Sequence, residues 1–229
     1  MAALHKTRGI VINYLKYGET SIITRIFTET FGIQSYIING VRSKKPRFSI
    51  SFFQPLSLLN LVVYKKKNAS LNRISEVECT SSASSISIDI YKSGIAIFIS
   101  EILSKTLKEE MEDQRLFHFL NQSIQILDQL KGGFENFHLL FLIKFSHYLG
   151  FSPISGTEIL SQIYQHIDHE SLEEVKYFDQ LIDADFSDHI KMNGDLRRQL
   201  LEDLIRYYQI HIENFGVVRS MDVLREVMR

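Results

Sequence analysis

The sequence of 229 residues predicts an α+β protein in which a small all-β domain precedes an α-helical bundle. Before residue 79, apolar residues occur in short β-branched runs between turn residues, and beyond residue 85 they recur with the 3.6-residue period of a helix. The charge changes sign at the same place. Because the serine-rich stretch 79–85 lies between the two parts, we expect domains at 1–79 and 80–229.

Five short runs in the first part have the composition of β-strands: residues 9–15, 21–27, 33–38, 56–64 and 69–77. Turn residues separate the first three runs, including Tyr17-Gly18-Glu19 and the dipeptide Asn39-Gly40. Five strands at a spacing of about 10–15 residues, mostly without helix-length patterns between them, predict a small barrel or sandwich.

Helical periodicity dominates the second part. Apolar residues share one helical face from Ile88 through Tyr91 to Ile102, and a second helix is expected before Lys131. Residues 134–149 are apolar nearly all round, which predicts the buried centre of a bundle. Gly150 ends that helix.

The pattern is weakest over residues 155–192. We expect this stretch to be irregular, apart from a short helix beginning at Ser171 with the capping pattern Ser-Leu-Glu-Glu. Asp195 is expected to cap a long helix after it, and Ser220 a terminal turn that ends at Arg229.

The net charge of −1 is an average over two parts of opposite sign. Residues 1–78 hold 12 Lys and Arg against four Glu, a net charge of +8, whereas the other residues hold 14 cations and 23 anions, a net charge of −9. Charge asymmetry of this kind indicates different partners for the two parts. The β domain is suited to a polyanion.

Two cationic loops are the candidate polyanion site. The first follows the third strand and the second joins the last two strands, and together they supply the candidate DNA-binding residues Arg42, Lys44, Lys45, Arg47, Lys65, Lys66 and Lys67. We expect the two loops to form one patch that contacts phosphates with little sequence specificity. The alternative is that they are ordinary solvated turns.

Aromatic residues near these loops could stack on bases, as single-strand binding requires. They are Tyr36, Phe48, Phe52, Phe53 and Tyr64. Phe52 and Phe53 are more typical of core positions.

Motifs for catalysis are missing. The sequence has no phosphate-binding loop, no Gly-x-Gly-x-x-Gly and no Gly-x-Ser-x-Gly. His166, Asp168 and His169 form the best metal-like cluster and would suit a metal-dependent hydrolase, but a surface cluster is the simpler reading. We therefore expect no enzyme activity, no cofactor and no metal.

The lone cysteine, Cys79, excludes an intramolecular disulfide and a four-cysteine zinc site. No apolar run approaches the length that crosses a bilayer, and the first residues lack the apolar segment of a signal peptide. We therefore expect a cytoplasmic protein.

Five fragments resemble the N-terminal half of the RecO family of bacterial recombination mediators, in its Bacteroidetes type. They are Gly9-Ile-Val, Tyr17-Gly18-Glu19, Thr28–Gly32, Gly40–Lys44 and Gln54-Pro55. Gly150-Phe-Ser-Pro153 and the stretch from Tyr207 to Leu224 are similar to later parts of the family. Arg42 and Lys44 lie in the matched motif, so they are the leading candidates for phosphate contacts.

The resemblance implies an N-terminal five-stranded OB-fold barrel followed by a helical-bundle domain. It also implies DNA repair by homologous recombination, with binding to single- and double-stranded DNA, annealing of complementary strands and help in loading RecA. The implied partners are RecR and the acidic C-terminal tail of single-strand binding protein. The tail needs an apolar hole with a cation beside it, for which Lys105, Lys108 and Arg115 are candidates.

One departure from the family concerns zinc. Many relatives carry a four-cysteine zinc module after the Gly-x-x-Pro segment, but no cysteine follows Pro153 here. Residues 155–192 must then be held together by packing alone. The alternative function from the residues is an OB-fold RNA-binding adaptor, because cationic loops do not distinguish ribose from deoxyribose.

Overall fold

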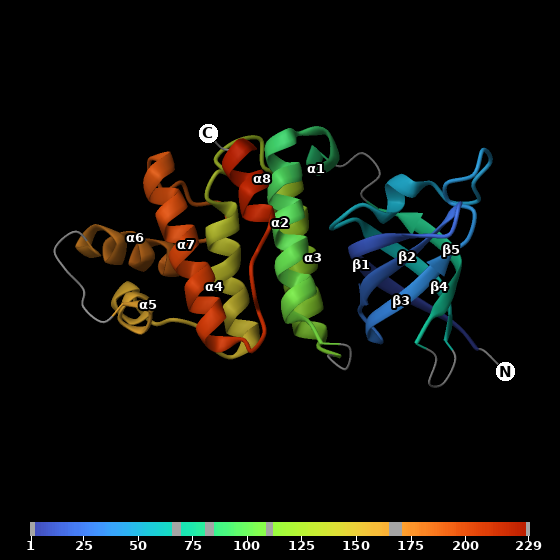
Figure 1. Ribbon diagram of the computed structural model, residues 1–229, viewed down its shortest axis with the longest axis horizontal. Helices are drawn as coiled ribbons and strands as arrows, with labels where there is room; N and C mark the ends of the chain where they lie inside the picture. The colour runs from blue at the N-terminus through green and yellow to red at the C-terminus, as the bar shows by residue number, and fades with distance from the viewer. Residues whose placement is uncertain (1–2, 66–69, 81–84, 109–111, 165–170, 228–229) are drawn as a thin grey trace. The chain divides into compact units, whose positions relative to one another are not determined.

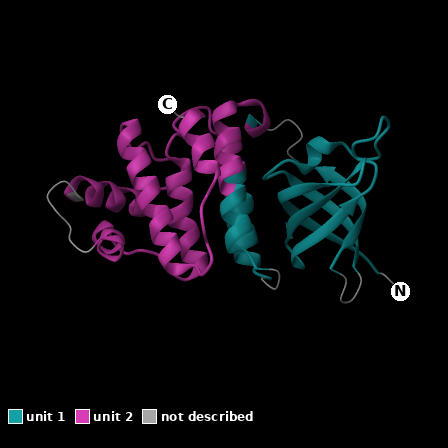
Figure 2. Ribbon diagram, in the orientation of Figure 1, with its two compact units in different colours: residues 1–85, 100–124 teal, residues 86–99, 125–229 magenta. Residues whose placement is uncertain are grey.

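A computed structural model of the chain describes residues 3–65, 70–80, 85–108, 112–164 and 171–227. The chain forms two compact units, coloured separately in Figure 2. The first unit contains residues 1–85 and 100–124, and the second contains residues 86–99 and 125–229. Two helices, α2 (Ile90–Thr106) and α3 (Gln114–Gln129), contribute residues to both units.

Five strands of the first unit close into a barrel (Figure 1). They are β1 (Ala3–Tyr17), β2 (Ser21–Thr28), β3 (Gly32–Ile38), β4 (Leu58–Lys65) and β5 (Asn72–Cys79). Their order around the barrel is β1-β2-β3-β5-β4, and only the β3–β5 pairing is parallel. The predicted fold class is confirmed, and closure of the sheet decides for a barrel over a sandwich.

Strand β1 is longer than predicted and contains a β-bulge. Val11 pairs with Ile26 and Asn13 pairs with Arg25, so Ile12 is the extra residue. The carbonyl of this residue accepts a hydrogen bond from the hydroxyl of Ser100. The bulge reverses the alternation of inward and outward side chains along the strand.

The barrel interior is filled by apolar side chains from all five strands. Gly9 of β1 allows the closest approach, because a Cβ there would lie 2.6 Å from Cγ2 of Ile26 and 2.8 Å from Cδ1 of Leu61. The η1 turn (Ile50–Phe53) closes one side with the buried ring of Phe53.

Residues 100–124 of the helices pack on the barrel wall in the same unit. The ring of Phe117 lies 5.9 Å from that of Phe27, and the guanidinium of Arg8 lies 5.3 Å from the Phe117 ring. Arg8 also binds the carboxylate of Glu29, with Nη2 2.6 Å from Oε1. Its hydrogen bonds hold the pKa of Glu29 below the usual value.

The second unit is helical. Its longer elements are α4 (Phe137–Leu149), α5 (Gly156–Ile163), α6 (Ser171–Asp183), α7 (Gly194–His211) and α8 (Ser220–Val227). Helix α4 is buried along most of its length, as its sequence predicts. Gly150 ends it with a φ of +86°, a conformation that favours glycine. From α7, the buried Tyr208 hydroxyl donates to the carbonyl of Leu142 at 2.6 Å.

The helix expected from Ser171 is present as α6, but the expectation that the rest of 155–192 is irregular is wrong, because α5 also lies in it. Gly156 begins α5 so close to α6 that a Cβ would lie 2.4 Å from the Val175 carbonyl oxygen. The Tyr164 hydroxyl, just after α5, donates to Oδ1 of Asp203 on α7 at 2.6 Å. Burial raises the pKa of Asp203 and also raises the pKa of Tyr164, to about 12.

Two further helix boundaries differ from the sequence prediction. The cap of α7 is Asn193, whose side chain accepts from the amide of Leu196 at 2.8 Å, and not Asp195. The helix expected to include Ile88 is interrupted by Asp89, whose carboxylate caps α2 by accepting from two backbone amides. Ile88, in the short helix α1 (Ser85–Ile88), is therefore 82% exposed.

The close approach at Gly156 is testable by substitution. We expect Gly156→Ala to lower the free energy of unfolding by about 1–3 kcal/mol, because the added methyl group displaces the backbone of α6. Gly132→Ala is the matched control, since a Cβ at that position meets no atom within 4 Å. Urea unfolding curves of the two variants would be compared, and equal stabilities would contradict the packing described here.

Candidate nucleic-acid interface

The first cationic loop, residues 40–47, is fastened to the turn between β1 and β2. The backbone amide of Arg42 donates to the carbonyl of Thr20 at 2.9 Å. Nη2 of the same residue donates to the carbonyl of Gly18 at 2.7 Å. Arg42 is half-buried, and its Nε atom is buried and finds no hydrogen-bond partner in the part of the chain that the structure describes. Arg42 therefore holds the loop in place as well as contributing charge.

The other end of the loop is fastened to β5. Nη2 of Arg47 donates to the carbonyl of Ser75 at 2.6 Å, and the guanidinium lies 5.0 Å from the ring of Phe48. Ser75 is the extra residue of a second bulge, because Val62 pairs with Glu76 and Val63 with Ile74. Arg47 thus binds a carbonyl that the strand pairing leaves available.

Between these two anchors, Lys44 and Lys45 are exposed. No residue of the described chain forms a hydrogen bond or ion pair with either ammonium group. The anchored loop therefore presents two lysines that can bind phosphates without first breaking internal ion pairs.

Lys65, the described lysine of the second cationic loop, binds partners at the other end of β3 from the first loop. Lys65 donates to Oε1 of Gln34 at 2.5 Å and lies 5.3 Å from the ring of Phe31. Gln34 lies near the start of β3 and Phe31 just before it, whereas residues 40–47 follow the other end of the strand, about 13 and 23 Å from them at 3.3 Å per residue. Lys66 and Lys67 lie outside the described residues.

Most of the aromatic residues named from the sequence belong to the barrel core. Tyr36 and Phe53 are 0% exposed, and Phe48 and Phe52 pack against the core. Desolvation raises the pKa of Tyr36 far above its ordinary value. Only Tyr64 of this group is substantially exposed, at 39%.

Another face of the barrel carries charges of both signs. A groove over β1, β4 and β5 is lined by the acidic residues Glu29, Glu76 and Glu78 together with Lys6 and Arg8. Because Arg8 is already bound to Glu29, this groove offers no positive excess to a polyanion.

The metal-hydrolase alternative gains no support from the described residues. His166, Asp168 and His169 lie outside them. Within the described ranges, no group of three or more His, Cys, Asp or Glu side chains could hold a metal ion. No helix in the same ranges is long and apolar enough to cross a membrane.

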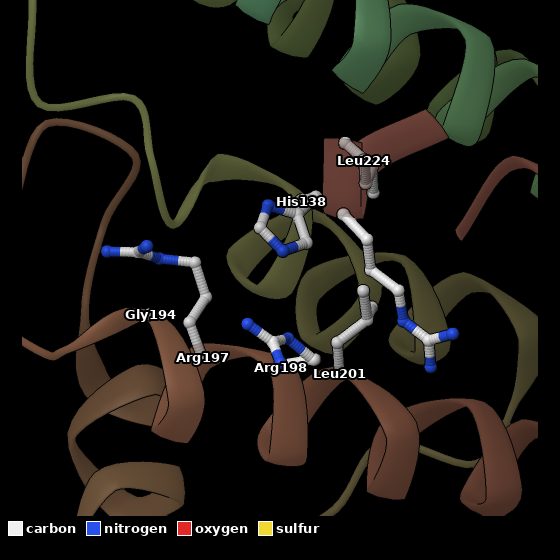
Figure 3. A pocket seen from close by; sticks show the side chains of 7 residues that line it. His138, Gly194, Arg197, Arg198, Leu201 and Leu224 are labelled. Carbon is white, nitrogen blue, oxygen red and sulfur yellow. The ribbon is translucent and has the colours of Figure 1, made fainter. Parts of the chain in front are cut away.

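The second unit contains a pocket with three arginines around apolar side chains (Figure 3). It is lined by His138, Gly194, Arg197, Arg198, Leu201, Leu224 and Arg225. The imidazole of His138 is 1% exposed, and its Nδ1 atom has no hydrogen-bond partner among the described residues. Burial and the nearby guanidinium of Arg197 lower the pKa of His138 to about 3, so the ring is neutral.

The three guanidinium groups differ in their partners. Arg225 and Arg198 pair with carboxylates on the surface. Arg197 instead donates from Nε to the amide oxygen of Asn136 at 2.8 Å. No carboxylate of the described chain forms a salt bridge with Arg197, whose pKa burial lowers. The candidates Lys105, Lys108 and Arg115 do not line this pocket.

Comparison with known proteins places these features in a family. The family description "Recombination protein O N terminal" matches residues 1–83, and "Recombination protein O C terminal" matches residues 88–156. The chain belongs to the RecO family. Proteins named DNA repair protein RecO are similar over nearly their whole length. The one from Flavobacterium psychrophilum is 37% identical over 97% of this chain and 98% of its own.

Two other RecO proteins show the same extent of similarity. The relative from Bacteroides fragilis is 35% identical over 98% of this chain and 99% of its own, and that from Christiangramia forsetii is 34% identical over 96% and 98%. The RecO resemblance inferred from the sequence fragments is therefore confirmed, together with its Bacteroidetes type. RecO membership makes the chain a DNA repair protein of the recombination-mediator class.

The neutral imidazole in the RecO chain predicts a pH dependence of stability. The folded state resists protonation of His138 down to about pH 3, whereas the unfolded chain is protonated near pH 6.5. The contribution of the neutral His138 to the free energy of unfolding is therefore complete above pH 6.5. It decreases by about 1.4 kcal/mol per pH unit as the pH falls toward 3.

Urea unfolding at pH 7 and pH 5 measures this contribution. We expect His138→Phe to lose less stability than the unchanged chain between these two values, since the variant has no group to protonate there. Identical losses in the two proteins would contradict the assignment of a neutral buried imidazole.

Proposed function

We propose that this RecO protein is a non-enzymatic mediator of recombination that binds single- and double-stranded DNA. Residues 1–79 would bind the nucleic acid, and residues 80–229 would serve protein partners. The observation that carries the proposal is the 40–47 loop, which is anchored through Arg42 and Arg47 and exposes Lys44 and Lys45 between the anchors.

The same loop supports annealing of complementary strands. Two DNA strands repel each other through their phosphates, and cations on a fixed loop reduce that repulsion without blocking the base edges. The contact requires no nucleotide hydrolysis, in keeping with the missing phosphate-binding loop motif. In this role the protein helps to load RecA on strands coated with single-strand binding protein, with RecR as its partner.

The arginine-lined pocket of the second unit supports docking of the acidic tail of single-strand binding protein. Leu201 and Leu224 provide apolar contacts for a terminal aromatic side chain. Arg197 forms no salt bridge with any described residue, so none has to break when it binds the terminal carboxylate. The buried His138 Nδ1 adds a polar atom that lacks a partner.

A second candidate function is an RNA-binding adaptor. The lysines of the loop recognise phosphates, which RNA and DNA share. Competition between matched DNA and RNA oligomers for the protein separates the two functions. Preference for the RNA oligomer would favour the adaptor.

Removal of the two exposed lysines tests the DNA interface. We expect Lys44→Ala with Lys45→Ala to weaken binding of an oligothymidylate and to reduce the slope of log affinity against log salt by about 1.4, at about 0.7 per phosphate. Fluorescence anisotropy over a salt series measures both quantities. The control is Lys131→Ala with Lys191→Ala, which removes two exposed lysines of the helical unit. An unchanged slope in the loop variant would reject the interface.

The tail pocket is tested with a peptide that ends in an aromatic residue. We expect Arg197→Ala to weaken peptide binding about tenfold, as loss of one charged hydrogen bond does. Calorimetric titration with a peptide whose terminal carboxylate is amidated completes the test. Amidation should weaken binding to the unchanged protein by a similar factor and should not weaken binding to the Arg197→Ala variant further. If the losses of affinity caused by Arg197→Ala and by amidation add up, Arg197 does not bind the terminal carboxylate. DNA affinity, which should not change, serves as the folding control.

A further inference from the structure

The end of β1 presents two apolar side chains to solvent. Beyond the bulge, Tyr14 packs against the barrel core, so Leu15 and Tyr17 project from the strand's outer side. Leu15 is 70% exposed and Tyr17 is 52% exposed. An exposed leucine and tyrosine separated by one residue on a strand need an explanation beyond the stability of the barrel.

Neighbouring strands extend this outer surface. Leu15 pairs with Ile23 of β2, which pairs with Ile37 of β3, which in turn pairs with the exposed Arg73 of β5. Both isoleucines are half-buried. The row therefore runs from apolar side chains to a cation across four strands.

Helical residues cover the preceding row of side chains on this outer face, which contains Asn13 and Arg25. Asn13 donates to the hydroxyl of Ser104 at 3.0 Å, and Arg25 contacts the same hydroxyl at 3.4 Å. Helical residues of the first unit thus cover the wall at Asn13. They leave Leu15, the next outward residue, open.

Tyr17 is joined directly to the anchor of the cationic loop. The next residue, Gly18, supplies the carbonyl that binds the guanidinium of Arg42, and Thr20 supplies the carbonyl that binds its amide. The exposed ring and the loop with Lys44 and Lys45 therefore flank the same turn. The lysines are complementary in charge to a polyanion, and the exposed tyrosine ring is suited to flat apolar groups. Single-stranded DNA has both properties.

We infer that Tyr17 stacks on an unpaired base of single-stranded DNA whose phosphates lie on the 40–47 loop. The inference rests on the proposed DNA-binding function. In a duplex the bases are stacked on one another and their faces are inaccessible. Tyr17 therefore contributes to binding of single strands and not of duplexes, whereas the lysines contribute to both.

Tyr17→Ala is the direct test. We expect it to weaken binding of an oligothymidylate about tenfold, the loss of one base–aromatic stack, with an unchanged salt slope. Binding of a duplex and of an abasic oligomer of the same length should not change. Tyr17→Phe, which keeps the ring, should bind like the unchanged protein.

The absence of tryptophan from the chain permits a second readout. Tyr17→Trp introduces the only indole, whose fluorescence should be quenched by the oligothymidylate and not by the abasic oligomer. Quenching by both would overturn the stacking inference.

Tyr64→Ala is the matched control, because Tyr64 is an exposed tyrosine at the end of β4. A loss of affinity in this variant with none in Tyr17→Ala would overturn the inference and place the base contacts elsewhere. In that outcome, the DNA-binding proposal would still hold if the slope of log affinity against log salt depends on Lys44 and Lys45. If the unchanged protein does not bind DNA, both the stacking inference and the DNA-binding proposal are rejected.

Discussion

The bulge at Ile12 is the constraint on which the arrangement of the first unit depends. An inserted residue leaves a carbonyl outside the strand pairing, and a buried carbonyl must be hydrogen-bonded. Ser100 provides that bond, and Ser104 binds Asn13 one position further along the strand. These contacts explain why residues 100–124 belong to the barrel unit although they lie in helices. The reversed alternation also points Tyr17 outward, next to the anchor of the cationic loop.

A buried polar cluster stabilises the helices that follow Pro153. Tyr164 donates to Asp203, which is 0% exposed, and Arg206 donates to the Tyr164 hydroxyl at 2.7 Å. Gly156 donates its amide to the carboxylate of Asp179 at 2.7 Å, which joins α5 to α6. Hydrogen bonds as well as apolar packing therefore hold these helices. The expectation of packing alone underestimated the polar contribution, because residues 23 to 42 positions apart in sequence supply it.

Periodicity and charge were sufficient to predict the five strands, the central helix at 137–149 and the cationic loop at 40–47. Local patterns could not predict the bulge, since its carbonyl partner Ser100 is 88 positions away. They also could not separate Lys65 from the loop, because the parallel pairing of β3 with β5 decides which loops share an end of the barrel. The sequence pattern places Tyr17 in a turn. Its exposure follows only from the change of alternation at Ile12.

On the proposed path, single-stranded DNA crosses the barrel at the β1–β2 turn, with its bases toward β1 and its phosphates on the 40–47 loop. Photo-crosslinking with an oligomer containing 5-iodouracil, followed by peptide mapping, tests this path directly. We expect crosslinks to Tyr17 and to the peptide that contains residues 40–48. Crosslinks confined to the β4–β5 connection or to residues 125–227 would contradict it.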